Sequence, residues 1–185
     1  GFQIWVGLPK DMEQKEATFH HTEADDIPVW HDGNLQYKLI AGELFGRKSP
    51  VPVHSKLFFL EIKSQDAKKI NIGGDLFGEV AMYVLDGTVN IDGNTFGGKQ
   101  LLIAKNATLC EFEMSENTTV YLFGGEPFNE ERFIFWNFVN SDKEIIEQAK
   151  INWYNQNHDA FPLVPGDEEE FVPLPKAILN SKLSK

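Results

Sequence analysis

Cysteine is almost absent from this 185-residue chain, and long apolar runs are absent altogether. Cys110 is the single cysteine, so no internal disulfide can form, which favours a reducing compartment and predicts a cytoplasmic protein. No stretch reaches the roughly 18 consecutive apolar residues that a membrane-spanning helix needs. The opening residues 1–5 (GFQIW) have the pattern of a strand rather than of a signal peptide. We therefore expect no association with a membrane.

Basic residues are scarce as well. The chain has 17 Lys and Arg against 28 Asp and Glu, which gives a formal net charge of −11. A surface with this excess of negative charge repels phosphate backbones, so we expect no direct binding to nucleic acid. The acidity identifies no partner, because ordinary solubility accounts for it.

The clearest structural pattern lies in residues 79–127. Short apolar runs rich in Val, Ile, Thr, Tyr and Phe are separated there by turn residues such as Asp86-Gly87 and Asp92-Gly93. This pattern predicts antiparallel strands, with glycine accepting the positive φ that tight turns need. The runs cover residues 79–85, 88–91, 100–104, 108–114 and 118–123.

Earlier segments add to this set of strands. Residues 35–41, 57–63 and 68–72 have the same composition and spacing. Ten or more short strands at close spacing predict an all-β fold, an antiparallel sandwich or barrel.

The hydrophobic period changes after a strand-like segment at 132–139. Apolar residues then recur at steps of three and four, which predicts a helix over about 142–155 packed by one face onto the sheet. The pair Ser141 and Glu144 fits a capping box at its start. The residues on the apolar face are Ile145, Ile146, Ala149 and Trp153.

The sequence predicts four parts. They are an inter-domain strand or linker at 1–18, a barrel at 19–140, a packed helix at 141–157 and an acidic tail at 158–185. Four prolines and the acidic run 167–170 exclude the tail from a sheet. Because the chain lacks an initiator Met and begins within an element, we expect it to be part of a longer protein.

Several segments resemble one protein family. Residues 83–93 (YVLDGTVNIDG) resemble the strand–turn–strand signature of cupin barrels. Residues 1–9 (GFQIWVGLP), 25–30 (DDIPVW), 40–46 (IAGELFG) and 122–176 resemble the pirin family of bicupins. The resemblance covers nearly the whole chain and is most specific in 122–176. The chain is similar to the C-terminal half of a pirin-like protein.

The resemblance implies a cupin-type antiparallel barrel or jelly roll with one helix after its last core strands. It also implies one metal site, of iron or another divalent metal, in the N-terminal cupin, built from several His and one Glu. That N-terminal cupin of the same protein is the implied partner, with other proteins as further candidates. Some bacterial pirin-like proteins are similar to quercetin dioxygenases, and animal members act as nuclear cofactors of transcription.

Metal ligands are missing where the general cupin pattern would place them. Counted back from the turn residue Gly87, the Glu position holds Val80. The third His would come from the strands around Cys110, and no His lies between His54 and His158. The two positions of the His-x-His pair hold Gly73 and Asp75, or Gly74 and Leu76. We therefore expect no metal, no cofactor and no catalytic residue in this chain.

One apolar pocket is a candidate binding site. Alternation within 108–114 turns Cys110 and Phe112 inward and the glutamates beside them outward. A buried Cys acts as a small hydrophobe. Met82, Cys110 and Phe112, with His54 at the rim of the barrel, could line a cavity.

Three functions are compatible with these features. The first is a non-catalytic C-terminal cupin that supports the metal-bearing N-terminal barrel and contacts partners. The second makes the chain part of a quercetin 2,3-dioxygenase-like enzyme whose metal lies in the N-terminal half. The third is a metal-free barrel that binds a small molecule.

Overall fold

The computed structural model describes residues 1–72, 74–104 and 111–175. Their contacts divide the chain into two compact units. The barrel unit is Glu16–Pro127, and the terminal unit joins Gly1–Lys15 to Phe128–Lys185. Residues 128–140, which the sequence assigned to the barrel, thus group with the helix. No helix in the described part of the chain is long and apolar enough to cross a membrane.

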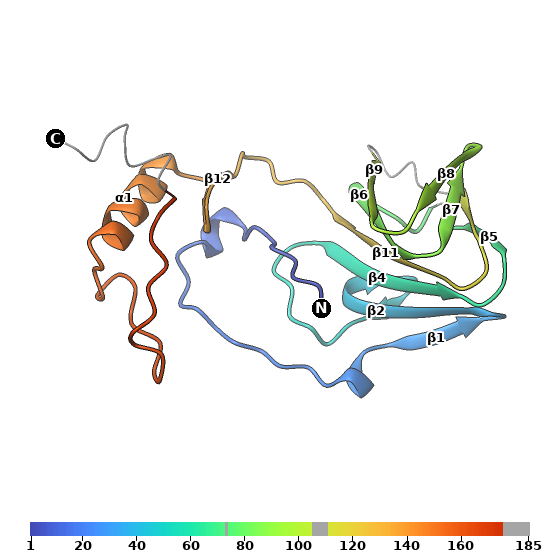
Figure 1. The fold of residues 1–185 in the computed structure, drawn as a ribbon, viewed down its shortest axis with the longest axis horizontal. Helices are drawn as coiled ribbons and strands as arrows, with labels where there is room; N and C mark the ends of the chain where they lie inside the picture. Colours follow the sequence, from blue (N-terminus) through green and yellow to red (C-terminus); the bar gives the residue numbers. More distant parts are fainter. Residues whose placement is uncertain (73, 105–110, 176–185) are drawn as a thin grey trace. The chain divides into compact units, whose positions relative to one another are not determined.

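The barrel unit consists of two antiparallel sheets (Figure 1). The seven-stranded sheet has the order β1-β2-β4-β11-β6-β9 with β3 paired to β2, and the four-stranded sheet has the order β5-β10-β7-β8. The strands are β1 (Val29–Asp32), β2 (Leu35–Leu44), β3 (Arg47–Lys48), β4 (Leu57–Ser64), β5 (Lys68–Asn71), β6 (Glu79–Asp86), β7 (Thr88–Ile91), β8 (Asn94–Gly97), β9 (Gln100–Ala104), β10 (Glu111–Met114) and β11 (Thr118–Gly125). A 3₁₀ turn, η2 (Ala24–Asp26), precedes β1.

The predicted hairpin turn at Asp92-Gly93 is confirmed. These two residues join β7 to β8 with φ of 51° and 79°, the left-handed pair that a two-residue hairpin requires. Gly87 has the predicted positive φ, 77°, but it connects β6 of the seven-stranded sheet to β7 of the four-stranded sheet, so Asp86-Gly87 does not close a hairpin. A Cβ on Gly87 would lie 2.1 Å from Oγ1 of Thr118, so only glycine fits at this position.

The core lies between the two sheets. Alternate residues of the long strands point inward, so Leu60 and Ile62 of β4 and Val120 and Leu122 of β11 are fully buried. Phe112 of β10 belongs to the same buried cluster from the four-stranded sheet. The fold is the predicted all-β arrangement of two facing antiparallel sheets with one described helix.

The terminal unit holds the hairpin β12 (Phe133–Phe135) and β13 (Phe138–Asn140), the helix α1 (Lys143–Tyr154) and a 3₁₀ turn, η1 (Lys10–Met12). One expectation was wrong here. Residues 132–139 form a hairpin rather than one strand, because Trp136 turns the chain with φ of 50°. Residues 3–8, expected to be an inter-domain strand or linker, belong to no strand of the described chain.

The helix starts one residue later than the capping box predicted. Asp142 is the N-cap, and its Oδ1 accepts a 2.8 Å hydrogen bond from the backbone N–H of Glu144. Ser141 instead donates through its hydroxyl to Oε2 of Glu13 at 2.7 Å. The hydroxyl that was predicted to cap the helix is thus hydrogen-bonded to Glu13, 128 residues away in the sequence.

The described part of the acidic tail packs within the terminal unit. Phe161 and Phe171 contact the Trp153 ring of α1 with centroid distances of 5.3 and 5.5 Å. The indole N–H of Trp153 donates to the carbonyl of Val172 at 2.9 Å. Leu174 is buried. The tail therefore covers the helix face that carries Trp153.

Candidate functional site

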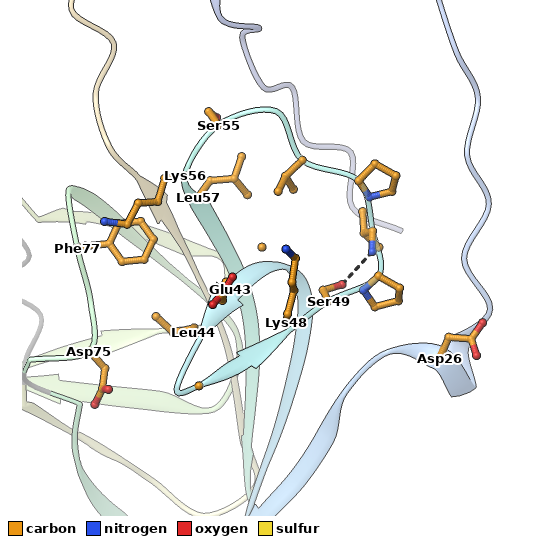
Figure 2. A pocket seen from close by; sticks show the side chains of 16 residues that line it. Asp26, Glu43, Leu44, Lys48, Ser49, Ser55, Lys56, Leu57, Asp75 and Phe77 are labelled. Atoms are coloured by element: carbon orange, nitrogen blue, oxygen red, sulfur yellow. Dashed lines mark hydrogen bonds between the residues drawn. The ribbon is translucent and has the colours of Figure 1, made fainter.

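A rim cleft with a volume of about 1170 Å³ opens in the barrel unit. Its walls come from the end of β2, from β3, from the loop 49–56, from the start of β4 and from residues 75 and 77 (Figure 2). Apolar and polar side chains contribute equally to these walls, with seven residues of each kind and two glycines. The apolar ones are Leu44, Pro50, Val51, Pro52, Val53, Leu57 and Phe77. A preformed apolar cleft with a few polar groups is the usual form of a small-molecule site.

The wall formed by the loop 49–56 is held in place by Ser49. Its buried hydroxyl donates to the carbonyl of Ile40 at 2.7 Å and accepts from the backbone N–H of Val51 at 3.2 Å. The backbone N–H of Ser49 donates to the carbonyl of Gly42 at 2.9 Å. Pro50 and Pro52 restrict the loop further, because their rings fix φ. The cleft is thus built before any ligand arrives.

Gly42 allows the two strands below the cleft to approach. Its φ is 81°, and a Cβ there would lie 1.9 Å from the carbonyl oxygen of Leu57. No other residue type fits this distance. Gly42 pairs with Phe58 of β4, just after the register of the two strands shifts between Leu39 and Ala41.

Two lysines bring positive charge to the cleft. The Lys56 ammonium lies 4.6 Å from the centroid of the Phe77 ring and forms an ion pair with Glu126. Lys48 comes from β3, where its Cα is paired with that of Glu43 on β2. Figure 2 shows the Lys48 side chain extending from β3 toward the middle of the cleft.

Carboxylates also border the cleft. Glu43 lies beside Lys48, whereas Asp26 and Asp75 lie at opposite margins with their carboxylates directed away from the middle (Figure 2). The lining therefore carries two lysines and three carboxylates beside its apolar residues. This site could not be predicted from a sequence motif. Its residues come from separate segments between residues 26 and 77, and only the fold brings them together.

The terminal unit has a different character: most of its apolar side chains remain exposed. Among its described residues, Ile146 and Leu174 are the hydrophobic side chains counted as buried. Large apolar side chains in the segment 2–8 are exposed by 37% to 56%. Others with high exposure are Ile134, Tyr154, Val164 and Val172. A surface of this kind normally contacts another protein surface.

A family model described as the pirin C-terminal cupin domain matches residues 59–159. The chain belongs to the pirin family. It is 38% identical over 177 residues to a pirin-like protein of Caulobacter vibrioides, covering 95% of this chain and 60% of that protein. The chain thus spans less than two thirds of the length of this pirin relative.

Solved structures agree with this assignment. A quercetin 2,3-dioxygenase from Acinetobacter baumannii superposes with a TM-score of 0.80 at 25% identity, covering 92% of this chain and 56% of the other. A second crystal structure with this name, from the same organism, gives a TM-score of 0.68 at 25% identity and covers 83% and 54%. The chain therefore has the pirin C-terminal cupin fold, and the cupin-type jelly roll inferred from sequence is confirmed.

The pirin relationship raises the question of a metal centre, and the residues at the cupin ligand positions do not fit one. Val80, at the carboxylate position, is 1% exposed within the apolar core. Leu76 is buried and Asp75 is exposed at the margin of the rim cleft. These positions supply one carboxylate and no imidazole, whereas a cupin centre needs several nitrogen ligands. Within residues 1–72, 74–104 and 111–175, no cluster of three or more His, Cys, Asp and Glu could hold an ion.

The four residues expected to line an apolar pocket lie in different places. Met82 and Phe112 are fully buried in the same core cluster. His54 is exposed on the loop 49–56 and is absent from the lining of the rim cleft. Cys110 lies outside the described residues. A pocket formed by these four residues stays a prediction, and the rim cleft is the site that the fold presents.

Proposed function

We propose that this chain is a non-catalytic C-terminal cupin of a pirin-like protein, which supports a metal-bearing N-terminal cupin and offers surface to partners. The exposed apolar surface of the terminal unit carries this proposal. Unfavourable exposure of many large apolar side chains is relieved when a partner covers them. The ligand positions filled by Val80 and Leu76 support a role without metal chemistry.

The segment 2–8 is the part of that surface we assign to the N-terminal cupin. Phe2, Ile4, Trp5 and Val6 are exposed by 47%, 39%, 54% and 56%, so neighbouring residues are exposed in turn along the extended chain. Adjacent side chains of a strand point to opposite faces, and apolar residues on both faces are typical of a strand that is covered on both sides. We infer that this segment adds a strand to a sheet of the N-terminal cupin.

Hydrogen exchange tests this assignment. In this chain alone, we expect the amides of residues 2–6 to exchange quickly. On a polypeptide that also carries the N-terminal cupin, they should be protected, since ladder hydrogen bonds slow exchange. Fast exchange in both forms would show that the segment is not a strand of that domain. The substitution Trp5→Glu should abolish the protection, and Val53→Glu in the barrel unit serves as the control.

Metal content tests the non-catalytic part. We expect no stoichiometric iron, nickel or zinc in this chain by elemental analysis after expression with each metal. A stoichiometric metal that survives dialysis would falsify the assignment of a role without metal.

A second candidate is a quercetin 2,3-dioxygenase-like enzyme with its metal in the N-terminal cupin. The fold similarity to the Acinetobacter baumannii quercetin 2,3-dioxygenase over 92% of this chain favours it. We expect oxygen-dependent cleavage of quercetin by the form with both cupins and none by this chain alone. Cleavage by this chain would overturn our assignment of the site, and its absence in both forms would leave only the supporting role.

A third candidate is that the metal-free barrel binds a small molecule. The rim cleft favours it, because it is a concave site in which apolar side chains lie beside a few charged groups. A thermal-shift screen with flavonoids and other aromatic compounds tests it, since a ligand that binds only the native state raises the melting temperature. The single cysteine remains our reason to place this protein in the cytoplasm.

A further inference from the structure

We propose that the rim cleft binds a planar aromatic anion whose acidic group contacts Lys48. The proposal deepens the third candidate above and rests on it. It adds the chemical class of the ligand and the residue that selects the charge.

The two lysines of the cleft differ in their partners. Lys56 is already paired with Glu126 and lies over Phe77. Lys48 has no ion-pair partner within 4.0 Å among the described residues. Its ammonium extends toward the middle of the cleft (Figure 2). Lys48 is therefore the cation that a ligand can engage without breaking an existing pair.

The walls around Lys48 suit a flat apolar body. Pro50, Pro52 and Leu57 line the same cleft as Lys48, and the proline rings fix φ in that part of the loop. A planar ring loses little conformational freedom on binding to such a surface, which favours it over a flexible chain. An acidic group on the ring then reaches the exposed Lys48 ammonium and accepts a charge-assisted hydrogen bond from it.

The negative charge of Glu43 lowers the affinity of the rim cleft for an anion. The Cα of Glu43 lies opposite that of Lys48 in the β2–β3 ladder, so the two side chains leave the same face of this strand pair. An anion bound at Lys48 is therefore repelled by Glu43 and attracted by Lys48. Removing the charge of Lys48 should therefore weaken the binding of an anion, whereas removing the charge of Glu43 should strengthen it. Residues with a purely structural role would not give opposite effects.

The experiment uses 2-naphthoate as the anionic probe and 2-naphthalenemethanol as its neutral counterpart, titrated by calorimetry and by protein-observed NMR. We expect saturable binding of 2-naphthoate, with shifts at residues 43–57, and at least fivefold weaker binding of the alcohol. Lys48→Met should weaken the affinity for 2-naphthoate roughly tenfold, because one charge-assisted hydrogen bond contributes about this factor. Glu43→Gln should strengthen it about two- to threefold. Lys68→Met, which removes an exposed lysine of β5 outside the cleft, should leave the affinity unchanged.

Each alternative result of this experiment would contradict a different part of the proposal. Equal affinities for the two probes would show that the site binds small molecules without selecting an anion. Loss of affinity in Lys68→Met as large as in Lys48→Met would show that net charge, rather than Lys48, attracts the probe. No saturable binding of either probe would reject both this proposal and the third candidate function. Circular dichroism melting of each variant separates a change in affinity from a loss of fold.

Discussion

The hydroxyl of Tyr121 on β11 donates a 2.6 Å hydrogen bond to Oε2 of Glu61 on β4. Both residues lie on the outer face of the seven-stranded sheet, where they are directly paired in the ladder. Glu61 is nevertheless only 8% exposed, and Oε1 of the same carboxylate forms a 3.0 Å ion pair with Lys63. A carboxylate removed from water in this way depends on its partners. The Tyr121 hydroxyl therefore helps to stabilise the negative charge of Glu61.

Tyr121→Phe should destabilise the barrel unit by about 1 to 3 kcal/mol, because it leaves a shielded carboxylate with one donor fewer. Urea unfolding followed by fluorescence measures this change. The double variant Tyr121→Phe with Glu61→Met removes both polar groups and should cost less than the sum of the two single changes. Strict additivity would show that the hydrogen bond contributes nothing.

The same pair predicts how stability depends on alkaline pH. Burial, followed by the hydrogen bond and the negative charge of Glu61, raises the pKa of Tyr121 above its ordinary value of 10.0. The folded protein thus holds the phenol proton more tightly than the unfolded chain does. The resulting stability is complete below pH 10.0 and is lost as the pH rises through the raised pKa.

Unfolding free energies measured across the alkaline range check this prediction. We expect the parent protein to lose stability above pH 10 more steeply than Tyr121→Phe, since the variant lacks the group with the raised pKa. Tyr37 contributes a smaller slope of the same sign to both proteins, because burial raises its pKa as well. Parallel curves would contradict the assignment to Tyr121.

Gly42→Ala should be among the most disruptive small changes in the barrel unit. Its Cβ would meet the carbonyl oxygen of Leu57 at 1.9 Å, and its φ of 81° is already unfavourable for alanine. Gly46→Ala is the matched control, because Gly46 has a φ of 67° and no atom within 4 Å of the added Cβ. We expect about 1 kcal/mol for Gly46→Ala and clearly more, above about 3 kcal/mol, for Gly42→Ala. Similar melting temperatures for the two variants would show that the strands below the rim cleft can move apart.

Most strands of the barrel unit could be predicted because their signals are local, whereas the short strands β3 and β8 were missed. Alternating residues such as those of β6 and turn pairs such as Asp92-Gly93 determine strand and hairpin within a few residues. The turn at Trp136 could not be predicted, since an aromatic residue with positive φ carries no turn signal. The cap at Asp142 could not be predicted either. The hydroxyl of Ser141 donates its hydrogen bond to Glu13, which is far away in sequence, so Asp142 caps the helix instead.

The candidate site was less accessible to sequence analysis than the fold. The residues of the rim cleft contribute no motif, and the strongest pattern around them, Pro50-Val51-Pro52, predicts only a loop. Its polar pair, Lys48 and Glu43, meets through the two-residue strand β3, which is too short for a periodic signal. By contrast, the inward positions of Phe112 and Met114 followed from alternation alone, and both are 1% exposed.

The final prediction concerns Arg132 and Glu13, which join the two sequence segments of the terminal unit. Nε of Arg132 lies 2.9 Å from Oε1 of Glu13, with only 12% and 7% of the two side chains exposed. The guanidinium also donates twice to the carbonyl of Leu8, and Glu13 accepts from the backbone N–H and hydroxyl of Ser141. Removing Glu13 leaves the shielded guanidinium with the more exposed Glu130 as its remaining ion-pair partner.

Glu13→Ala should therefore destabilise the terminal unit by about 3 kcal/mol or more. Limited proteolysis should cut residues 1–15 faster in this variant, while hydrogen exchange in β4 and β11 stays as in the parent. Glu130→Ala is the control, because Glu130 pairs with the same arginine but is 42% exposed, and such pairs contribute little. If Glu130→Ala has as large an effect as Glu13→Ala, the shielded pair is not what anchors the N-terminal segment to the residues around Ser141.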